Sequence, residues 1–191
     1  MRTKPEGSWM DFSAEQYFDL THSSFVWFTE VKALPLISLW GRDKLINGQG
    51  EMLIKLLALI PVVNEKGHAK IDQASMQRFL GEISWFPWAA LNSNIHWDSI
   101  DDTSARATLE VESAQVSGVF RFTPQGQLIS FETQRYYGGD KDAQLQTWLI
   151  EMLDYKEFQR IIIPYKCRVT WILPDGDFNW LNLEITELEF N

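Results

Sequence analysis

The sequence predicts an α+β protein that is mainly antiparallel β, with a curved sheet or half-barrel wrapped around one inserted helical segment. Three observations favour this class. Short segments rich in β-branched and aromatic residues recur along the chain, turn sequences separate them, and one stretch near the middle has helical periodicity. A sheet with one apolar face must cover that face, and the helical segment is available to do so.

The first third of the chain predicts consecutive short strands. Residues 25–31 are dense in β formers, residues 34–39 are apolar, and Asn47-Gly48 is a hairpin turn signal. Residues 13–16 match a helix capping box, but their strand-like flanks favour a strand. Residues 51–63 predict either a strand buried on both faces or a short helix, because periodicity does not separate these alternatives.

The most distinct helix is expected between Asp72 and Pro87. Asp72 is the expected N-cap, and Pro87 ends the helical pattern. Four apolar residues between them fall on one face of a helix: Met76, Phe79, Leu80 and Ile83. This element should therefore pack its apolar face against the sheet.

The rest of the chain returns to strands joined by turns. Residues 124–126 and 174–177 combine Pro and Gly as hairpin turns do. The segment 140–158 is open between a short helix and an edge strand around Trp148. Strands are predicted at residues 96–100, 105–112, 115–122, 128–136, 163–171 and 178–190.

Length and composition predict a single domain over residues 1–191. The chain is large enough to bury a core without disulfides, and no linker or repeat divides it. Strand-like sequence begins close to Met1, so the chain also fits the C-terminal portion of a longer protein. No signal peptide opens it, which predicts a cytoplasmic location as given and an extracytoplasmic one if an N-terminal segment is missing. The apolar run 52–63 is too short for a transmembrane segment.

The net charge of −9 argues against nucleic acid as a partner. Residues 96–191 carry sixteen acidic and eight basic side chains, and no basic cluster is interleaved with aromatic residues. Such a surface repels a phosphate backbone.

The candidate ligand-binding residues centre on the predicted helix. Arg78 and Glu82 stand four residues apart, so they can pair on a solvated face or point together at a ligand in a concave surface. Asp43 precedes a Gly-rich turn, where it either makes a fixed contact or caps its own turn. Arg135 is a second cation that could hold an acidic group. The expected aromatic lining is Trp27, Trp85 and Trp97.

Evidence for catalysis or a metal is weak in this sequence. Common nucleophile, phosphate-loop, dinucleotide and zinc-protease motifs are missing, so no catalytic residue, cofactor or metal ligand is predicted. The cluster from His96 to Asp102 lacks the spacing of a metal loop. Cys167 is expected to be a core residue. A hydrolase would have to pair Glu82 with Asp43 or Asp101, which nothing in the sequence brings together.

Several motifs carry a family resemblance over nearly the whole chain. They are Trp9-x-x-Phe-x-Ala-Glu-Gln-Tyr17, Phe25-x-Trp27, Gly41-Arg-Asp43 with Asn47-Gly-x-Gly-x-Met52, Arg78-Phe-Leu-x-Glu-x-x-Trp-Phe-Pro87, Trp97-x-x-Ile-Asp101 and Arg135-Tyr136. In this order they resemble a bacterial family named domain of unknown function 6544, which implies no reaction. Trp88 departs from the small residue that often follows its Trp-Phe-Pro motif.

The order of strands, helix and strands is also similar to the half-barrels of lipoprotein carriers, which hold acyl chains in a concave face. This likeness implies non-enzymatic binding of an apolar or acidic, lipid-like small molecule in an aromatic-lined concavity. The alternatives are a structural or protein-interaction domain with a filled core and the paired-carboxylate hydrolase. The sequence predicts no oligomeric state.

Overall fold

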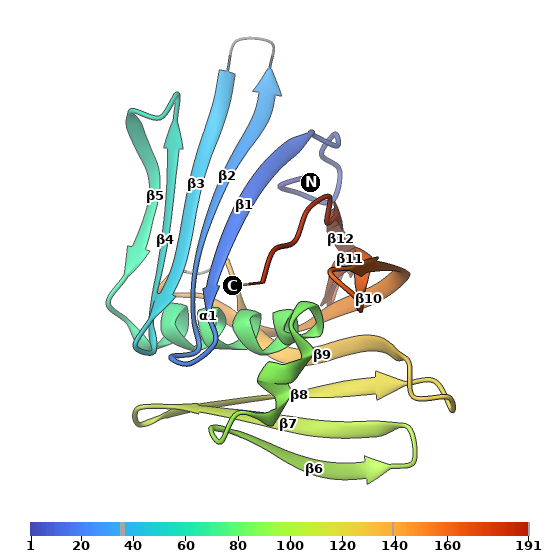
Figure 1. The fold of residues 1–191 in the computed structure, drawn as a ribbon. Helices are drawn as coiled ribbons and strands as arrows, with labels where there is room; N and C mark the ends of the chain where they lie inside the picture. The colour runs from blue at the N-terminus through green and yellow to red at the C-terminus, as the bar shows by residue number, and fades with distance from the viewer. Residues whose placement is uncertain (35–36, 139, 191) are drawn as a thin grey trace.

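Two antiparallel β-sheets and one α-helix make up the fold of this chain (Figure 1). The computed structural model describes residues 1–34, 37–138 and 140–190. The predicted mainly antiparallel β architecture with one inserted helix is confirmed, although the strands divide between two sheets rather than forming one. Within the described residues no strand of one sheet pairs with the other, so the sheets do not close into a barrel.

The first sheet has five strands in sequence order, each paired with the next. Its strands are β1 (Phe12–Asp19), β2 (Ser24–Leu34), β3 (Ile37–Ile46), β4 (Gln49–Leu56) and β5 (Ile60–Lys66). The strand expected at residues 13–16 is confirmed within β1. Residues 51–63 are neither one strand nor a helix but a hairpin, which turns at Leu57 and Ala58. Of the apolar segment 34–39, Pro35 and Leu36 lie outside the described residues.

The helix α1 (Ala69–Glu82) continues into two short 3-10 helices, η1 (Ile83–Trp85) and η2 (Pro87–Leu91). The expected N-cap at Asp72 is wrong, because the helix begins one turn earlier. His68 is the cap: its Nδ1 accepts a hydrogen bond from the backbone N–H of Ile71. Asp72 instead accepts from the backbone N–H of Gly50 at 2.7 Å, which ties the first turn of α1 to β4.

The second sheet has seven strands in the order β12-β11-β10-β9-β8-β7-β6. Residues 144–158 form the long strand β10, so the helix alternative for segment 140–158 is wrong, and the strand is present but as an inner strand rather than an edge strand. Strands pair on both sides of Trp148, and its side chain is buried because it projects into the hydrophobic core. The last strand ends at Glu184 rather than at residue 190. The strands are β6 (Ile95–Asp101), β7 (Ser104–Val111), β8 (Ala114–Phe122), β9 (Leu128–Tyr137), β10 (Gln144–Phe158), β11 (Ile161–Leu173) and β12 (Gly176–Glu184).

Helix α1 packs against β4 of the first sheet and against β8 and β9 of the second (Figure 1). Glycines permit both approaches. A Cβ at Gly50 would lie 2.5 Å from the carbonyl oxygen of Ile71, and a Cβ at Gly81 would lie 2.8 Å from the Phe131 ring. We call the face of each sheet that is turned toward α1 its inner face. One hydrophobic core joins α1 to the inner faces of both sheets.

A β-bulge interrupts β10 between Met152 and Tyr155. Trp148, Ile150 and Met152 alternate onto the inner face and are buried, after which Leu153 and Asp154 are both exposed. The extra residue shifts the alternation, so that Tyr155 returns to the inner side.

Candidate ligand-binding site

Arg78 stands at the centre of a polar cluster on the inner side of α1. Its Nη1 donates to Asp43 Oδ2 at 2.8 Å, and its Nε donates to Glu82 Oε1 at 2.8 Å. Its Nη2 donates to Gln16 Oε1 at 3.2 Å, and Gln16 Nε2 donates in turn to Glu82 Oε2 at 2.7 Å. Three strands and the helix thus contribute to one network, because the guanidinium also lies 4.8 Å from the Trp27 ring on β2.

This network brings together residues that the sequence placed on separate elements. Asp43, Arg78, Glu82 and Trp27 are all in it, and Arg78 pairs with Glu82 on the next turn, but in a largely buried site rather than on a solvated helix face. Gln16 was missed. The signal that could have found it is its place in β1, where it occupies the inward side of an alternating pattern with Phe12 and Phe18.

Burial and nearby charges have opposite effects on the pKa values of Asp43 and Arg78. Burial raises the pKa of the Asp43 carboxyl, while the nearby positive charges of Arg78 and Arg135 oppose that rise. Burial acts to lower the pKa of Arg78, but Glu82 and Asp43 more than offset it, so this pKa lies above its ordinary value. Arg78 is therefore a firmly charged residue whose donors are occupied by protein acceptors.

Arg135 has a different environment, although it is also half-buried. Its Nε donates to the carbonyl oxygen of Ala74 at 2.9 Å, and its guanidinium carbon lies 4.7 Å from the Trp148 ring centroid and 5.6 Å from that of Trp171. Within the part of the chain that is described, no carboxylate lies within 4.0 Å of it and no acceptor bonds to its Nη atoms. Burial, followed by the charge of Arg78, lowers its pKa to about 10.

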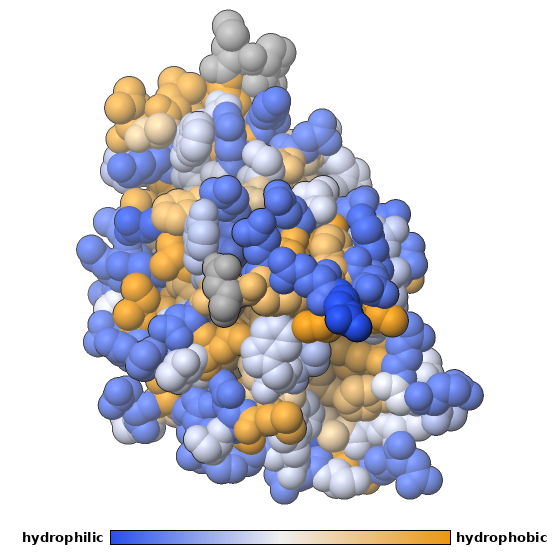
Figure 2. Space-filling view, in the orientation of Figure 1, coloured by the Kyte–Doolittle hydropathy of each residue, from blue (hydrophilic) through white to orange (hydrophobic). Residues whose placement is uncertain are grey.

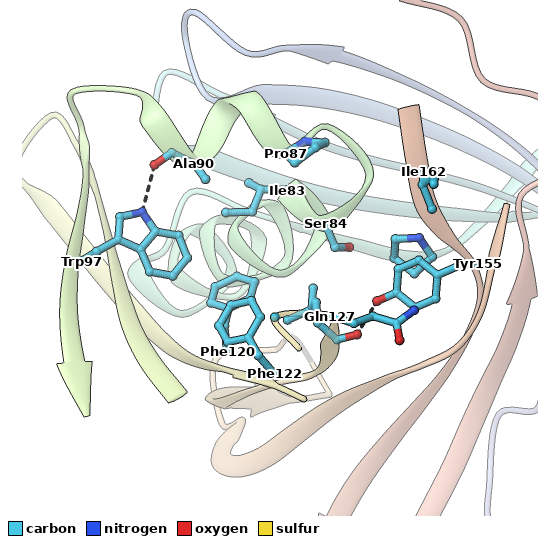
Figure 3. Close-up of a pocket in the computed structure, with 13 residues that line it drawn as sticks. Ile83, Ser84, Pro87, Ala90, Trp97, Phe120, Phe122, Gln127, Tyr155 and Ile162 are labelled. Carbon is cyan, nitrogen blue, oxygen red and sulfur yellow. Dashed lines mark hydrogen bonds between the residues drawn. The ribbon is translucent and has the colours of Figure 1, made fainter. Parts of the chain in front are cut away.

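A separate apolar pocket of about 500 Å³ lies beyond the C-terminal end of α1 (Figure 3). Trp97 of β6, Phe120 of β8 and Tyr155 of β10 are arranged around it. Trp97 donates its indole N–H to the carbonyl oxygen of Ala90 at 2.9 Å, and the Tyr155 hydroxyl donates to the carbonyl oxygen of Leu128. In the space-filling view an apolar hollow is visible on this side of the molecule (Figure 2). Trp97 is thus part of this pocket and not of the Arg78 network.

The third predicted aromatic residue, Trp85, lies beside Cys167 near the Arg78 network. Cys167 is 1% exposed, and burial raises the pKa of its thiol to about 12, with Trp85 opposing and Glu82 adding to the rise. A thiol with this pKa is almost entirely protonated at neutral pH. The expectation that Cys167 is a core residue is confirmed.

The structure also bears on metal binding and on membrane crossing. In residues 1–34, 37–138 and 140–190 no three His, Cys, Asp or Glu side chains come close enough to hold a metal ion. In the cluster from His96 to Asp102, the Nε2 atom of His96 instead lies 3.7 Å from Oε2 of Glu110. No helix in the described part of the chain has the length and apolar character needed to cross a membrane.

The fold and the site define a two-sheet antiparallel β protein with an arginine-centred cluster over the one α-helix of its described residues. The model of a family of unknown function, DUF6920, matches residues 1–190, and the chain belongs to that family. The resemblance to domain of unknown function 6544 was therefore wrong. Short motifs of Trp, Phe, Gly and Pro describe tight turns and aromatic packing, which unrelated β-rich families share. No curated protein and no solved structure matches the chain.

Proposed function

We propose that the two sheets and α1 act as a half-barrel that binds a small lipid-like molecule with an acidic head group. The observation that carries this proposal is Arg135. Arg135 is half-buried with its guanidinium against two Trp rings, and its Nη donors have no protein acceptor in the described residues. A carboxylate or phosphate can accept two parallel hydrogen bonds from these donors.

The surroundings of Arg135 support an anionic ligand over a structural ion pair. Trp148 and Trp171 hold the guanidinium against their rings, which fixes its plane without neutralising its charge. Asp43 and Glu82 influence its pKa but are bonded to Arg78. A ligand anion would therefore supply the charge that the protein has not placed beside Arg135.

The apolar pocket supports a ligand with a hydrocarbon part. Its volume of about 500 Å³ falls in the range of small-molecule sites, and most of its lining is aliphatic or aromatic. It adjoins Ile83, nine residues along the helical segment from Ala74, which is roughly 13 Å at 1.5 Å per residue. We propose that the head group binds at Arg135 and that the chain extends along the inner face toward this pocket.

The experiment is a binding assay with a long-chain fatty acid and with phosphatidic acid on delipidated protein, preceded by native mass spectrometry of gently purified protein. Wild type should bind one of them, and Arg135→Met should weaken that binding at least tenfold, whereas Arg135→Lys should weaken it less. Arg168→Met is the control, because Arg168 lies on the same sheet with its side chain 46% exposed. Failure of wild type to bind either lipid would overturn the proposal and favour an interaction domain.

A further inference from the structure

The far end of the five-stranded sheet carries a cluster of exposed apolar side chains, which we call the apolar tip. The last pair of β2 and β3, Leu34 with Ile37, lies at this end, and the β4–β5 hairpin turns here. The Leu57 N–H donates to the carbonyl oxygen of Ser38 at 2.9 Å and so links this turn to β3. Leu59 is 79% exposed, Ile60 59% and Val62 54%. Orange atoms gather at the same place in the space-filling view, above the polar flank of the sheet (Figure 2). The apolar tip consists of Ile37, Trp40, Leu57, Leu59, Ile60 and Val62.

The charge of this end differs from that of the whole protein. Residues 31–40 and 53–64 contain Lys32 and Lys55 but no Asp or Glu, although the chain has 26 acidic residues and a net charge of −9. Lys32 is exposed and Lys55 is half-buried beside the turn. One carboxylate also borders the apolar tip: Glu30 pairs with Trp40 across β2 and β3 and accepts a hydrogen bond from the Ser38 hydroxyl at 2.9 Å. Two lysines and one half-buried carboxylate thus accompany the tip, in contrast to the acidic excess of the whole chain.

The turn between β4 and β5 places apolar residues where a polar turn would be easier to form. Leu57 and Ala58 have φ angles of 52° and 59°, a left-handed conformation that normally selects Asn-Gly. At the opposite end of the same sheet, the β3–β4 turn does use Asn47 and Gly48, with φ angles of 50° and 73°. The chain therefore accepts backbone strain at the tip and keeps an exposed leucine there.

We propose that the apolar tip docks this protein onto a membrane that contains anionic lipids. Protruding aliphatic side chains with a Trp and flanking lysines suit the bilayer interface, where the apolar groups enter the acyl boundary and the ammonium groups meet anionic head groups. This inference does not depend on an interior ligand, because the surface could dock whether or not Arg135 binds one.

A second copy of the chain fits this surface less well. In a two-fold dimer through the tip, the lysines of one copy would approach those of the other, and the carboxylate beside them, that of Glu30, is already bonded to the Ser38 hydroxyl. The surface is also formed by hairpin ends rather than by a broad sheet face (Figure 1). Both features favour a fluid anionic surface over a complementary protein.

The test is co-sedimentation with vesicles of phosphatidylcholine alone and of phosphatidylcholine with phosphatidylglycerol. Wild type should sediment with the mixed vesicles, and Leu59→Ser should lower its partition coefficient about tenfold. Leu91→Ser is the matched control, because Leu91 is 87% exposed on η2, outside the tip, and its loss should leave partitioning unchanged. Lys32→Glu should weaken sedimentation with the mixed vesicles in particular.

A double variant separates docking from stability. Replacing Leu57 by Asn and Ala58 by Gly gives the tip a favoured turn, so the melting temperature should stay the same or rise while vesicle binding falls. Three results would overturn the proposal: wild type that sediments with neither vesicle, equal losses for Leu59→Ser and Leu91→Ser, or a double variant that binds as wild type does. Light scattering that shows a dimer dissociated by Leu59→Ser, without vesicle binding, would assign the tip to self-association.

Discussion

Arg78 and Arg135 both feel the charges of Asp43 and Glu82, but only Arg78 forms ion pairs with them. The charge of Arg78, after burial, also helps to lower the pKa of Arg135 to about 10. Arg78 thus donates to other protein side chains, whereas Arg135 has Nη donors without a protein acceptor in the described residues. This difference leads to opposite expectations for the same substitution at the two positions.

Arg78→Met should destabilise the protein by about 3–5 kcal/mol, because Asp43 and Glu82 would lose their shared cation in a largely enclosed site. Chemical denaturation monitored by Trp fluorescence measures this change. Arg168→Met, at an exposed pair with Glu151, should cost roughly 0.5 kcal/mol or less. Equal losses for the two variants would show that the Arg78 network contributes no more than a surface ion pair.

Arg135→Met should leave the free energy of unfolding unchanged or raise it by about 1 kcal/mol, because it replaces a half-buried charge without an ion-pair partner by an apolar side chain of similar length. The lost hydrogen bond to Ala74 limits the gain. The same denaturation experiment applies. A loss as large as that of Arg78→Met would mean that Arg135 is structural and would remove the main support for a ligand anion there.

Gly118→Ala should cost about 1–3 kcal/mol through overpacking, since a Cβ on Gly118 would overlap the ring of Phe131, which is fully buried. Thermal unfolding of the variant should show a clear decrease in melting temperature. The neighbouring change Ser117→Ala, on the same strand, provides the control and should have a small effect. An unchanged melting temperature for Gly118→Ala would indicate that the Phe131 ring moves aside easily.

Cys167 should make stability fall at alkaline pH. Its thiol pKa is raised to about 12 in the folded protein against 9.0 as the ordinary value, so above pH 9 the unfolded chain loses a proton that the folded chain keeps. Relative to Cys167→Ala, wild type should lose roughly 1 kcal/mol between about pH 8 and pH 10. Parallel curves of stability against pH for the two proteins would contradict this prediction.

The fold class could be predicted from the sequence because alternation and turn residues are local signals. Asn47-Gly48 marked its hairpin, and the helix around Arg78 and Glu82 was recognised from its apolar face. The hairpin at Leu57 was missed because its turn carries no Gly, Asn or Pro, and only the surrounding sheet selects its left-handed backbone. The position of the N-cap was missed because His68 is not among the preferred capping residues.

The sequence identified most of the residues that meet around Arg78, but not how they contact one another. Arg78, Glu82, Asp43 and Trp27 converge, but no sequence signal tells that Arg78 uses its donors within the protein while Arg135 does not. That difference depends on contacts between β9, β10 and β11, which are set by strand order. The placement of Trp97 in a separate pocket has the same origin, because β6 is the edge strand farthest from β12 in the second sheet.

The bulge in β10 reverses which residues of the strand, even-numbered or odd-numbered, face inward. Before it, even-numbered residues such as Trp148 face inward and serve the Arg135 region; after it, odd-numbered Tyr155 faces inward and serves the pocket. The one extra residue of the bulge thus determines which side chains of β10 face inward on each side of it. Related sequences with one residue more or fewer near position 153 would keep the strand but present a different residue to the pocket.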